Sequence, residues 1–423
     1  MLKTLIGTTD PQNYSQYLNE KIDNVVSLFK KNNLQIPSHQ VFASPSEYYR
    51  MRTEFSIYFT NDYTDFTFCM FEPKTKPKKR IELASFPVGS KAINKGMELL
   101  KKYLMQYHEL SFKLFETDFL SNQKDELVIA LNFHKKIDED KFKLEASKLK
   151  ADFLKEGLSV NFIGRAKKQS ILVDTDTILE TIHTRDKDFY LYQVEGNFSQ
   201  PNIYACQNMV QFARDCCTNC SDVDLIELYC GSGTFTVCLA DLFRKVMSTE
   251  VSRVPTATAL KNIEKNNITN TKIARLSAVE VAQALEGVRE FNRLRFANID
   301  IKEYNFNTLL IDPPRSGLEY KEALDFTARF DRVIYISCGP ESLVKDLTYL
   351  TKTHKITKIA FFDQFPYTNH LETGVLLETP NVPGVFTKEW KPEIKIDFDA
   401  KNSEHRRRQL RSRFKSYCNL HFR

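Results

Sequence analysis

From residue 223 onward, short apolar runs alternate with longer segments of helical spacing. The runs lie at residues 223–229, 245–248, 308–311, 332–336, 356–362 and 375–377. Strand-length apolar runs separated by helices are typical of a doubly wound α/β domain with a mostly parallel sheet. In such sheets ligands bind outside the carboxyl ends of the strands. The residues that follow each run are therefore the first candidates for function.

The first part of the chain has a different pattern, which predicts a separate α+β domain over residues 1–190. Aromatic-rich runs at residues 54–59 and 66–71 alternate enough to predict half-buried strands. Residues 91–107 and 140–154 carry apolar side chains at helical spacing. This mixture does not require a parallel sheet.

The length of 423 residues also favours two domains, because single hydrophobic cores rarely grow so large. We place the α/β domain at residues 191–379 and a basic extension at residues 380–423. From His405 onward the extension contains no acidic residue. It is either a solvated terminus or a contact for a polyanion such as RNA, and the sequence leaves both interpretations open.

Composition narrows the class of protein. Hydrophobic residues make up 42% and charged residues 27% of the chain, as in ordinary globular proteins, and the net charge of +6 permits a polyanionic partner without requiring one. Nine cysteines at irregular spacing do not indicate a disulfide framework, and no apolar run approaches the length of a membrane span. We therefore expect a reduced, cytoplasmic protein with no membrane partner.

Three of the cysteines lie close together, at Cys216, Cys217 and Cys220. No second ligand pair at zinc spacing accompanies them. We interpret them as surface or half-buried thiols at the end of a helix, and we expect no metal.

A glycine turn follows the run at residues 223–229. Gly231 and Gly233 let the backbone pass close beneath a ligand, and Glu250, after the next run, can accept hydrogen bonds from ribose hydroxyls. Thr236 stands where a dinucleotide fingerprint has its third glycine, so an adenosine ligand without phosphates fits better than a dinucleotide. The alternative is an ordinary turn between a strand and a helix.

Three further polar residues lie near the ends of later runs. Asp312 begins the string DPPR, Cys338 follows the run at residues 332–336, and Glu372 precedes the last run. Singly they have ordinary explanations: a turn residue, a small core thiol and a surface acid. Their order along the chain, all near strand ends beyond a glycine loop, favours a catalytic site.

At these residues the sequence resembles the RNA uracil-5 methyltransferase family, and within it the tRNA branch. The similarity extends to about residue 379. The strings that carry it are residues 48–55 (YYRMRTEF), 198–202 (FSQPN), 227–231 (ELYCG), 287–294 (GVREFNRL), 312–318 (DPPRSGL), 337–338 (SC) and 362–367 (FDQFPY).

The resemblance implies a Rossmann-like S-adenosylmethionine-dependent methyltransferase domain joined to an N-terminal RNA-binding domain. It implies Cys338 as the nucleophile and Glu372 as the base that accepts the C5 proton. The positions that match the family's contacts with S-adenosylmethionine are Gln200, Tyr229, Thr234, Glu250 and Asp312. Thr234 and Gly339 depart from the pattern, since asparagine is common at both positions.

The implied chemistry explains why a cysteine and a carboxylate are needed. C5 of uracil is a weak nucleophile, and addition of a thiolate to C6 places electron density on C5. After the methyl group is transferred, a base must remove the C5 proton before the thiolate can leave. Something must favour the thiolate of Cys338 at neutral pH, because a free thiol has a pKa of about 8.5.

The implied substrate is uridine at position 54 of the tRNA T-loop, and other RNAs with a similar hairpin are possible partners. Arg50, Arg52 and the basic loop at residues 74–80 are candidates to contact phosphates, and Phe115 is a candidate to stack on a base or to join the core. The target base must leave its stack. No cysteine cluster that could hold an iron–sulfur centre precedes Tyr48, which favours tRNA over ribosomal RNA.

Three other functions stay open. The same chemistry on ribosomal RNA is the nearest alternative, and a cytosine-5 methyltransferase would also use a cysteine adduct. An RNA-binding or folding factor without catalysis is the third, although intact Cys338, Glu372 and Asp312 argue against it.

Overall fold

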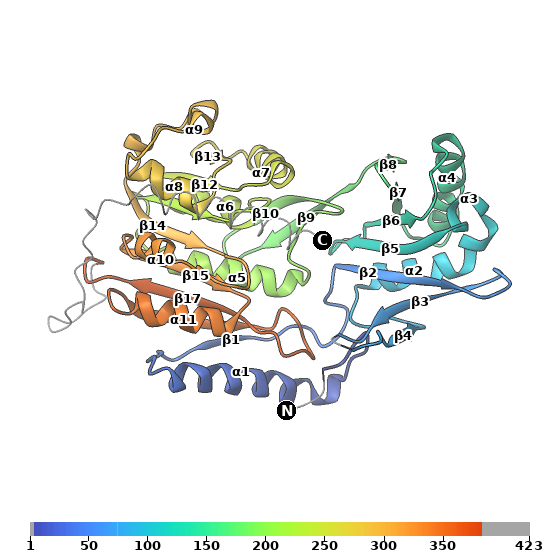
Figure 1. Cartoon of the computed structure of the whole chain (residues 1–423), viewed down its shortest axis with the longest axis horizontal. Helices are drawn as coiled ribbons and strands as arrows, with labels where there is room; N and C mark the ends of the chain where they lie inside the picture. The colour runs from blue at the N-terminus through green and yellow to red at the C-terminus, as the bar shows by residue number, and fades with distance from the viewer. Residues whose placement is uncertain (1–3, 74, 383–423) are drawn as a thin grey trace.

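The computed structural model describes residues 4–73 and 75–382, which form two sheet-based domains side by side (Figure 1). The predicted basic extension, residues 380–423, lies outside the described residues except for its first three. Within the described part, no helix is both long and apolar enough to span a membrane.

An eight-stranded sheet forms the centre of the larger domain, here called the large domain. Its strand order is β1-β16-β17-β15-β14-β11-β12-β13, and only the pairs made by β17 are antiparallel. The mostly parallel sheet predicted from the apolar runs is confirmed. The strands are β1 (Gln40–Phe42), β11 (Asp224–Leu228), β12 (Lys245–Thr249), β13 (Thr271–Ala274), β14 (Phe306–Ile311), β15 (Arg332–Ser337), β16 (Lys355–Phe362) and β17 (Glu372–Glu378).

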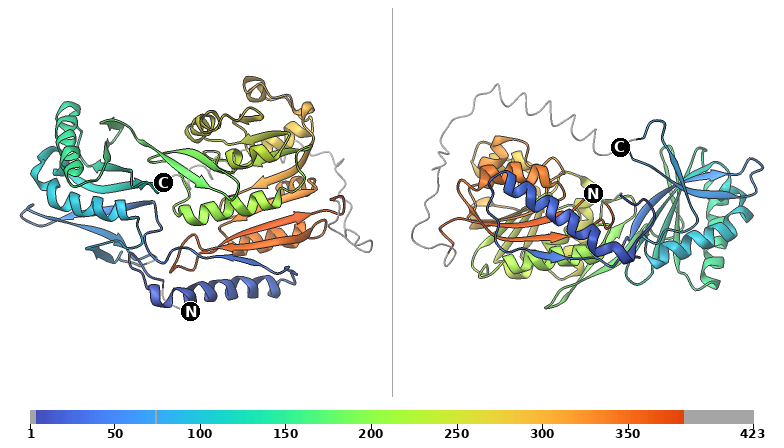
Figure 2. Two further views of the ribbon diagram at one scale, coloured as in Figure 1. Left: turned by 180° about the vertical axis from the view of Figure 1, so that it is seen from behind. Right: turned by 90° about the horizontal axis from the view of Figure 1, so that it is seen from below.

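Helices cover both faces of this sheet (Figures 1 and 2). One hydrophobic core contains residues of α1 (Tyr14–Lys31), α8 (Ala278–Leu285), α9 (Asn292–Phe296), α10 (Lys321–Thr327) and α11 (Pro340–Leu350). The core on the other face contains residues of α5 (Ile203–Cys216), α6 (Thr234–Leu239) and α7 (Arg253–Lys265). Short 3-10 helices are η1 (Pro11–Asn13), η3 (Ala240–Leu242) and η4 (Ile301–Glu303).

The two cores explain why the strands of the large domain are continuous apolar runs. Successive residues of a strand point to opposite faces. Leu309 and Ile311 of β14 therefore enter one core, while Leu310 enters the other. A strand buried on both faces needs apolar residues at every position.

A seven-stranded mixed sheet forms the second domain, here called the small domain. Its strand order is β4-β3-β2-β5-β6-β7-β8, in which only β6 and β7 are parallel. Its strands are β2 (Arg52–Phe59), β3 (Phe66–Phe71), β4 (Arg80–Leu83), β5 (Leu114–Ser121), β6 (Leu127–Phe133), β7 (Val160–Ala166) and β8 (Gln169–Leu172). Its helices are α2 (Lys91–Tyr103), η2 (Leu104–Gln106), α3 (His108–Ser111) and α4 (Glu139–Lys155). The α+β prediction is confirmed, with strands and helices close to their predicted ranges.

A hairpin of β9 (Thr177–His183) and β10 (Asp188–Val194) links the two domains. It contacts β6 of the small domain and α5 and α7 of the large domain. In Figure 1 the hairpin, drawn in green, extends from the large domain toward the small one.

The division of the chain differs from the predicted one at its start. We placed residues 1–190 in a single N-terminal domain, but β1 pairs with β16 of the large domain. Helix α1 packs into the core of that same domain (Figure 1). The sequence of an amphipathic helix does not indicate which sheet the helix will cover. The packing of α1 and β1 on the large domain is therefore visible only in the tertiary structure.

Candidate active site

The glycine turn joins β11 to α6 at the carboxyl edge of the large sheet. Gly231 has a φ of +53° and Gly233 a φ of +82°, and both are left-handed conformations that favour glycine. A Cβ atom built on Gly233 would lie 3.1 Å from Cβ of Ala259, whereas one built on Gly231 would meet no atom within 4 Å. Gly233 therefore allows close packing against α7, and Gly231 lies beneath open space.

Glu250 holds this turn from the end of β12. Its carboxylate accepts hydrogen bonds from the backbone N–H groups of Gly231, at 3.1 Å, and Ser252, at 2.7 Å. Tyr229 and Thr234, the two other predicted contacts here, stand on either side of the glycines. An acid beside open space over a glycine turn fits the ribose of an adenosine ligand, because it can accept hydrogen bonds from ribose hydroxyls.

A buried polar group beneath the turn was not predicted from the sequence. Glu227 of β11 accepts hydrogen bonds from the hydroxyls of Thr236 and Ser248, the latter at 3.0 Å. Burial raises the pKa of Glu227 to about 7. Thr236 stands where a dinucleotide fingerprint has its third glycine, and it donates a hydrogen bond to the buried carboxyl group of Glu227.

The catalytic candidates lie together at this same edge of the sheet. Asp312 follows β14, Cys338 follows β15, and Glu372 is the first residue of β17. Because β17 runs antiparallel to β15, its first residue lies at the carboxyl end of β15, where Ser337 pairs with Thr373. Sheet topology alone thus places Glu372 beside the Cys338 loop.

The electrostatics of the site show that these three side chains interact. Burial, and then the charges of Glu372 and Asp312, raise the pKa of Cys338 to about 12. Burial and Asp312 raise the pKa of Glu372, which is only 6% exposed, to about 8. Burial raises the pKa of Asp312 to about 7. The surroundings of Cys338 therefore favour the thiol over the thiolate, and the weaker effect of Arg315 in the opposite direction does not reverse this.

Gln200 lies in the loop at residues 195–202, here called the linking loop, which joins β10 to α5. Its side-chain oxygen accepts a 2.8 Å hydrogen bond from Nε2 of Gln364. Gln364 is fully buried in the string at residues 362–367, and its sequence neighbours do not indicate a role for it. The strings at residues 198–202 and 362–367 were both conspicuous, but no pattern within either one indicated that they meet.

The residues predicted to contact RNA have varied surroundings. Nε of Arg50 donates to the carbonyl of Arg52, and the Arg50 guanidinium lies 6.0 Å from the ring centroid of Phe365. Phe115 of β5 is half-buried and stacks on His134, with ring centroids 3.8 Å apart. It is thus part of an aromatic pair and not of the core.

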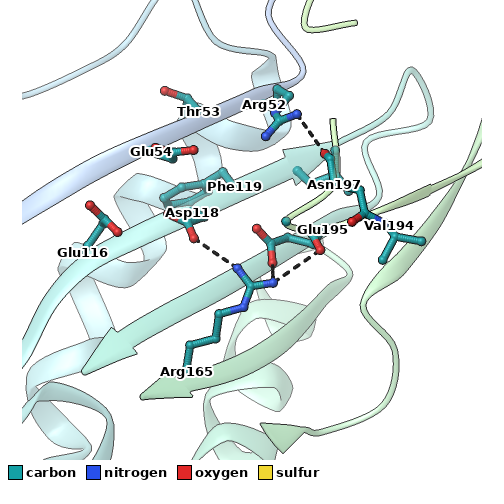
Figure 3. A pocket seen from close by; sticks show the side chains of 12 residues that line it. Arg52, Thr53, Glu54, Glu116, Asp118, Phe119, Arg165, Val194, Glu195 and Asn197 are labelled. Atoms are coloured by element: carbon teal, nitrogen blue, oxygen red, sulfur yellow. Dashed lines mark hydrogen bonds and ion pairs between the residues drawn. The ribbon is translucent and has the colours of Figure 1, made fainter. Parts of the chain in front are cut away.

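Arg52 lines a cavity of about 250 Å³ in the small domain, beside the linking loop (Figure 3). It donates to the carbonyl of Asn197 at 2.9 Å, and Arg165 lies between Asp118 and Glu195. Carboxylates outnumber guanidinium groups around this cavity, and no catalytic candidate lines it. A contact between Arg52 and phosphate stays a prediction.

The predicted basic loop is exposed over residues 76–80, while residue 74 lies outside the described part. The cysteine group is at the end of α5 as predicted, but all three thiols are buried and not at the surface. The Cys220 sulfur accepts a 2.7 Å hydrogen bond from Arg332. Among the described residues, no group of three or more His, Cys, Asp or Glu side chains is placed to hold a metal ion.

A glycine turn with an acid held beside it, on a mostly parallel sheet flanked by helices, is the arrangement of a Rossmann-like methyltransferase domain. The family profile described as tRNA (Uracil-5-)-methyltransferase matches residues 13–380. The chain belongs to this family.

Relatives of similar length support the assignment. The tRNA/tmRNA (uracil-C(5))-methyltransferase of Photobacterium profundum is 41% identical over 378 residues, which cover 89% of this chain and 100% of the relative. The protein of the same name from Colwellia psychrerythraea is 42% identical over 367 residues, covering 87% of this chain and 98% of the relative.

A solved structure shares the fold. The Pyrococcus abyssi tRNA (uracil-54, C5)-methyltransferase in complex with S-adenosyl-L-homocysteine aligns with a TM-score of 0.63 and 19% sequence identity. The alignment covers 86% of this chain and 83% of that one. The shared fold includes both domains, since neither alone makes up that share of the chain.

Proposed function

We propose that this protein transfers a methyl group from S-adenosylmethionine to C5 of uridine at position 54 of the tRNA T-loop, and that it acts in the cytoplasm. The observation that carries the proposal is the grouping of Cys338, Glu372 and Asp312 at one edge of the sheet that also bears the glycine turn. Family membership and the names of the relatives support tRNA as the substrate.

The cofactor would lie over Gly231, with Glu250 at its ribose and with Gln200, Tyr229, Thr234 and Asp312 as further contacts. The fit rests on the open space above Gly231 and the carboxylate held at its edge. Bound there, S-adenosylmethionine supplies an electrophilic methyl group on a positively charged sulfur.

The chain's own residues carry the covalent steps. Sγ of Cys338 bonds to C6 of uracil as the thiol gives its proton to solvent, and the C5–C6 π electrons move to C5. C5 then takes the methyl group as the bond between that methyl carbon and the cofactor sulfur breaks, so that S-adenosylhomocysteine is the leaving group. Glu372 accepts the C5 proton, the electrons of the C5–H bond form the C5–C6 π bond, and the C6–Sγ bond breaks with its electron pair on sulfur, which takes up a proton from solvent to restore Cys338.

RNA recognition is assigned to the small domain and the linking loop. We keep Arg50 and Arg52 as candidate phosphate contacts and Phe115, with its stacked partner His134, as a candidate platform for an unstacked base. Other RNAs with a hairpin like the T-loop are expected substrates on the same grounds, and the relatives' names include tmRNA.

Trapping with 5-fluorouridine tests the mechanism. A T-arm RNA with 5-fluorouridine at position 54 is incubated with the protein and S-adenosylmethionine, and a denaturing gel separates protein–RNA adduct from free RNA. We expect a stable adduct, because fluorine at C5 cannot be removed as a proton. Cys338→Ala should form none, while Cys69→Ala, which changes a buried thiol of β3, should form it normally.

The alternatives give different results in the same assay. An adduct with a ribosomal RNA fragment but not with the T-arm would favour the ribosomal substrate. Methylation of cytosine-containing RNA would favour a cytosine-5 methyltransferase. Binding of tRNA without adduct or methyl transfer would favour a folding factor and refute the proposed chemistry.

A further inference from the structure

The strings at residues 198–202 and 362–367 meet in the interior of the protein, between the linking loop and the end of β16. Asn202 is fully buried and caps α5 by accepting a 3.2 Å hydrogen bond from the N–H of Ala205. Its Nδ2 donates to Ser44 at 2.7 Å and to the main-chain oxygen of Gln364 at 3.3 Å. The main chain at Gln364 is therefore tied to the start of a helix.

A buried ion pair holds Asp363, the residue before Gln364, in place. Lys21 of α1 lies 2.5 Å from a carboxylate oxygen of Asp363 and also donates to the carbonyl of Phe365 at 2.7 Å. The other carboxylate oxygen accepts a 2.8 Å hydrogen bond from Tyr14. Because Asp363 and Phe365, on either side of Gln364, are both held by Lys21, the backbone of Gln364 has little freedom to move.

The side chain of Gln364 acts on Gln200. It is fully buried, and its Nε2 donates to Oε1 of Gln200 at 2.8 Å. Oε1 of Gln364 has no hydrogen-bond partner among the described residues. A side-chain amide has one oxygen and one NH2 group. Because Gln364 holds the side-chain oxygen of Gln200, the NH2 group of Gln200 is directed away from Gln364 and is available as a donor.

The two acids among the predicted cofactor contacts cannot serve every part of the ligand. Glu250 and Asp312 suit the hydroxyl and ammonium groups of S-adenosylmethionine. Its carboxylate is an anion and needs a hydrogen-bond donor. Among the predicted contacts Gln200 offers an amide NH2 group for this purpose, beside the hydroxyl groups of Tyr229 and Thr234.

We propose that Gln364 is a positioning residue that fixes the Gln200 amide with its NH2 group toward the carboxylate of the bound cofactor. The identity of the ligand rests on the proposed function. Because Gln364 is fully buried, it would act on the cofactor only through Gln200, and its replacement should raise the KM for S-adenosylmethionine and leave kcat at saturation within about twofold of wild type.

Two ligands distinguish this role from a general loss of structure. S-Adenosylhomocysteine has the carboxylate, while 5′-methylthioadenosine lacks the whole amino-acid part. Calorimetric titration of Gln364→Met, which keeps a similar volume without the donor, should show S-adenosylhomocysteine binding weakened about tenfold, as expected for one hydrogen bond to a charged group. Binding of 5′-methylthioadenosine should stay within about twofold of wild type.

A second variant keeps the test decisive if Gln364→Met does not fold. In Gln200→Glu, Gln364 would still donate to one oxygen, and the other oxygen would repel the ligand carboxylate. S-Adenosylhomocysteine binding should then fall by more than about tenfold, again with little change for 5′-methylthioadenosine. Thr368→Ala, which removes a hydroxyl bonded to Phe365 in the same loop, is the matched control and should change neither affinity.

The outcomes separate the two proposals. Equal losses for both ligands, or no loss for either, would overturn the role of Gln364 while the proposed function stands. Wild-type protein that binds neither ligand would overturn the proposed function and this inference with it.

Discussion

The two glycines of the cofactor turn should respond to alanine in opposite ways. Both have left-handed backbones, with φ of +53° at Gly231 and +82° at Gly233, so each alanine carries a strain of about 1–2 kcal/mol. At Gly231 this is the whole cost, since no atom lies within 4 Å of the added Cβ. At Gly233 the added Cβ lies 3.1 Å from Cβ of Ala259, and overpacking adds about 1–3 kcal/mol.

Ligand binding should show the reverse order. The open space above Gly231 is where we place the cofactor, so a methyl group there displaces the ligand. The methyl group at Gly233 points toward α7 instead. We expect Gly231→Ala to weaken binding of S-adenosylhomocysteine at least about 100-fold, which corresponds to about 2.7 kcal/mol, and Gly233→Ala to weaken it less than about tenfold.

Urea unfolding gives the free energy of unfolding of each variant, and calorimetric titration gives the dissociation constant. Gly231→Ala should have a larger free energy of unfolding than Gly233→Ala and should bind S-adenosylhomocysteine more weakly. Wild-type affinity in Gly231→Ala would refute the position of the cofactor. A larger loss of stability in Gly231→Ala than in Gly233→Ala would refute the steric reasoning.

Three further predictions concern charged groups. Glu372→Gln should still transfer a methyl group but retain labelled RNA as a covalent adduct on a denaturing gel, since no base accepts the C5 proton; rapid release of methylated RNA would contradict this. Alkylation of Cys338 by iodoacetamide should increase about tenfold for each pH unit from about 7 to about 10, because its pKa is raised to about 12. At pH 8 about one thiol in 10,000 is then ionised, against about one in ten for a pKa of about 9, and a rate that levels off above about pH 9 would show that the pKa is not raised. Lys21→Met should cost about 3–5 kcal/mol in urea unfolding by leaving the buried carboxylate of Asp363 without its cation, whereas a loss below about 1 kcal/mol would show that the pair contributes little.

The edge of the sheet that carries the site could be predicted because parallel strands impose it. Once the apolar runs are interpreted as a parallel sheet, the residues after β11, β12, β14 and β15 must lie at one edge. Glu372 joins them only because β17 runs antiparallel, and the sequence contains no mark of that direction. Its place before the last run is visible in the sequence, but the strand direction that brings it to the site is not.

Contacts between distant segments could not be predicted. The hydrogen bond from Gln364 to Gln200 joins residues 164 positions apart, and the Lys21–Asp363 pair joins residues 342 positions apart. Neither side chain of such a pair has a sequence neighbour that indicates its partner. For the same reason the return of β1 and α1 to the large domain was missed, since pairing with β16 is visible only in the folded chain.

The raised pKa values indicate an order for the proton transfers. Glu372 and Asp312 raise the pKa of Cys338, so a thiolate forms most easily while both carboxyl groups are protonated. Glu372, the proposed base, must instead be ionised to remove the C5 proton. Once Sγ is bonded to C6 it is an uncharged thioether, and a negative charge on Glu372 no longer faces a thiolate. Formation of the proposed adduct therefore removes one source of repulsion, while burial and Asp312 still hold the pKa of Glu372 above its usual value.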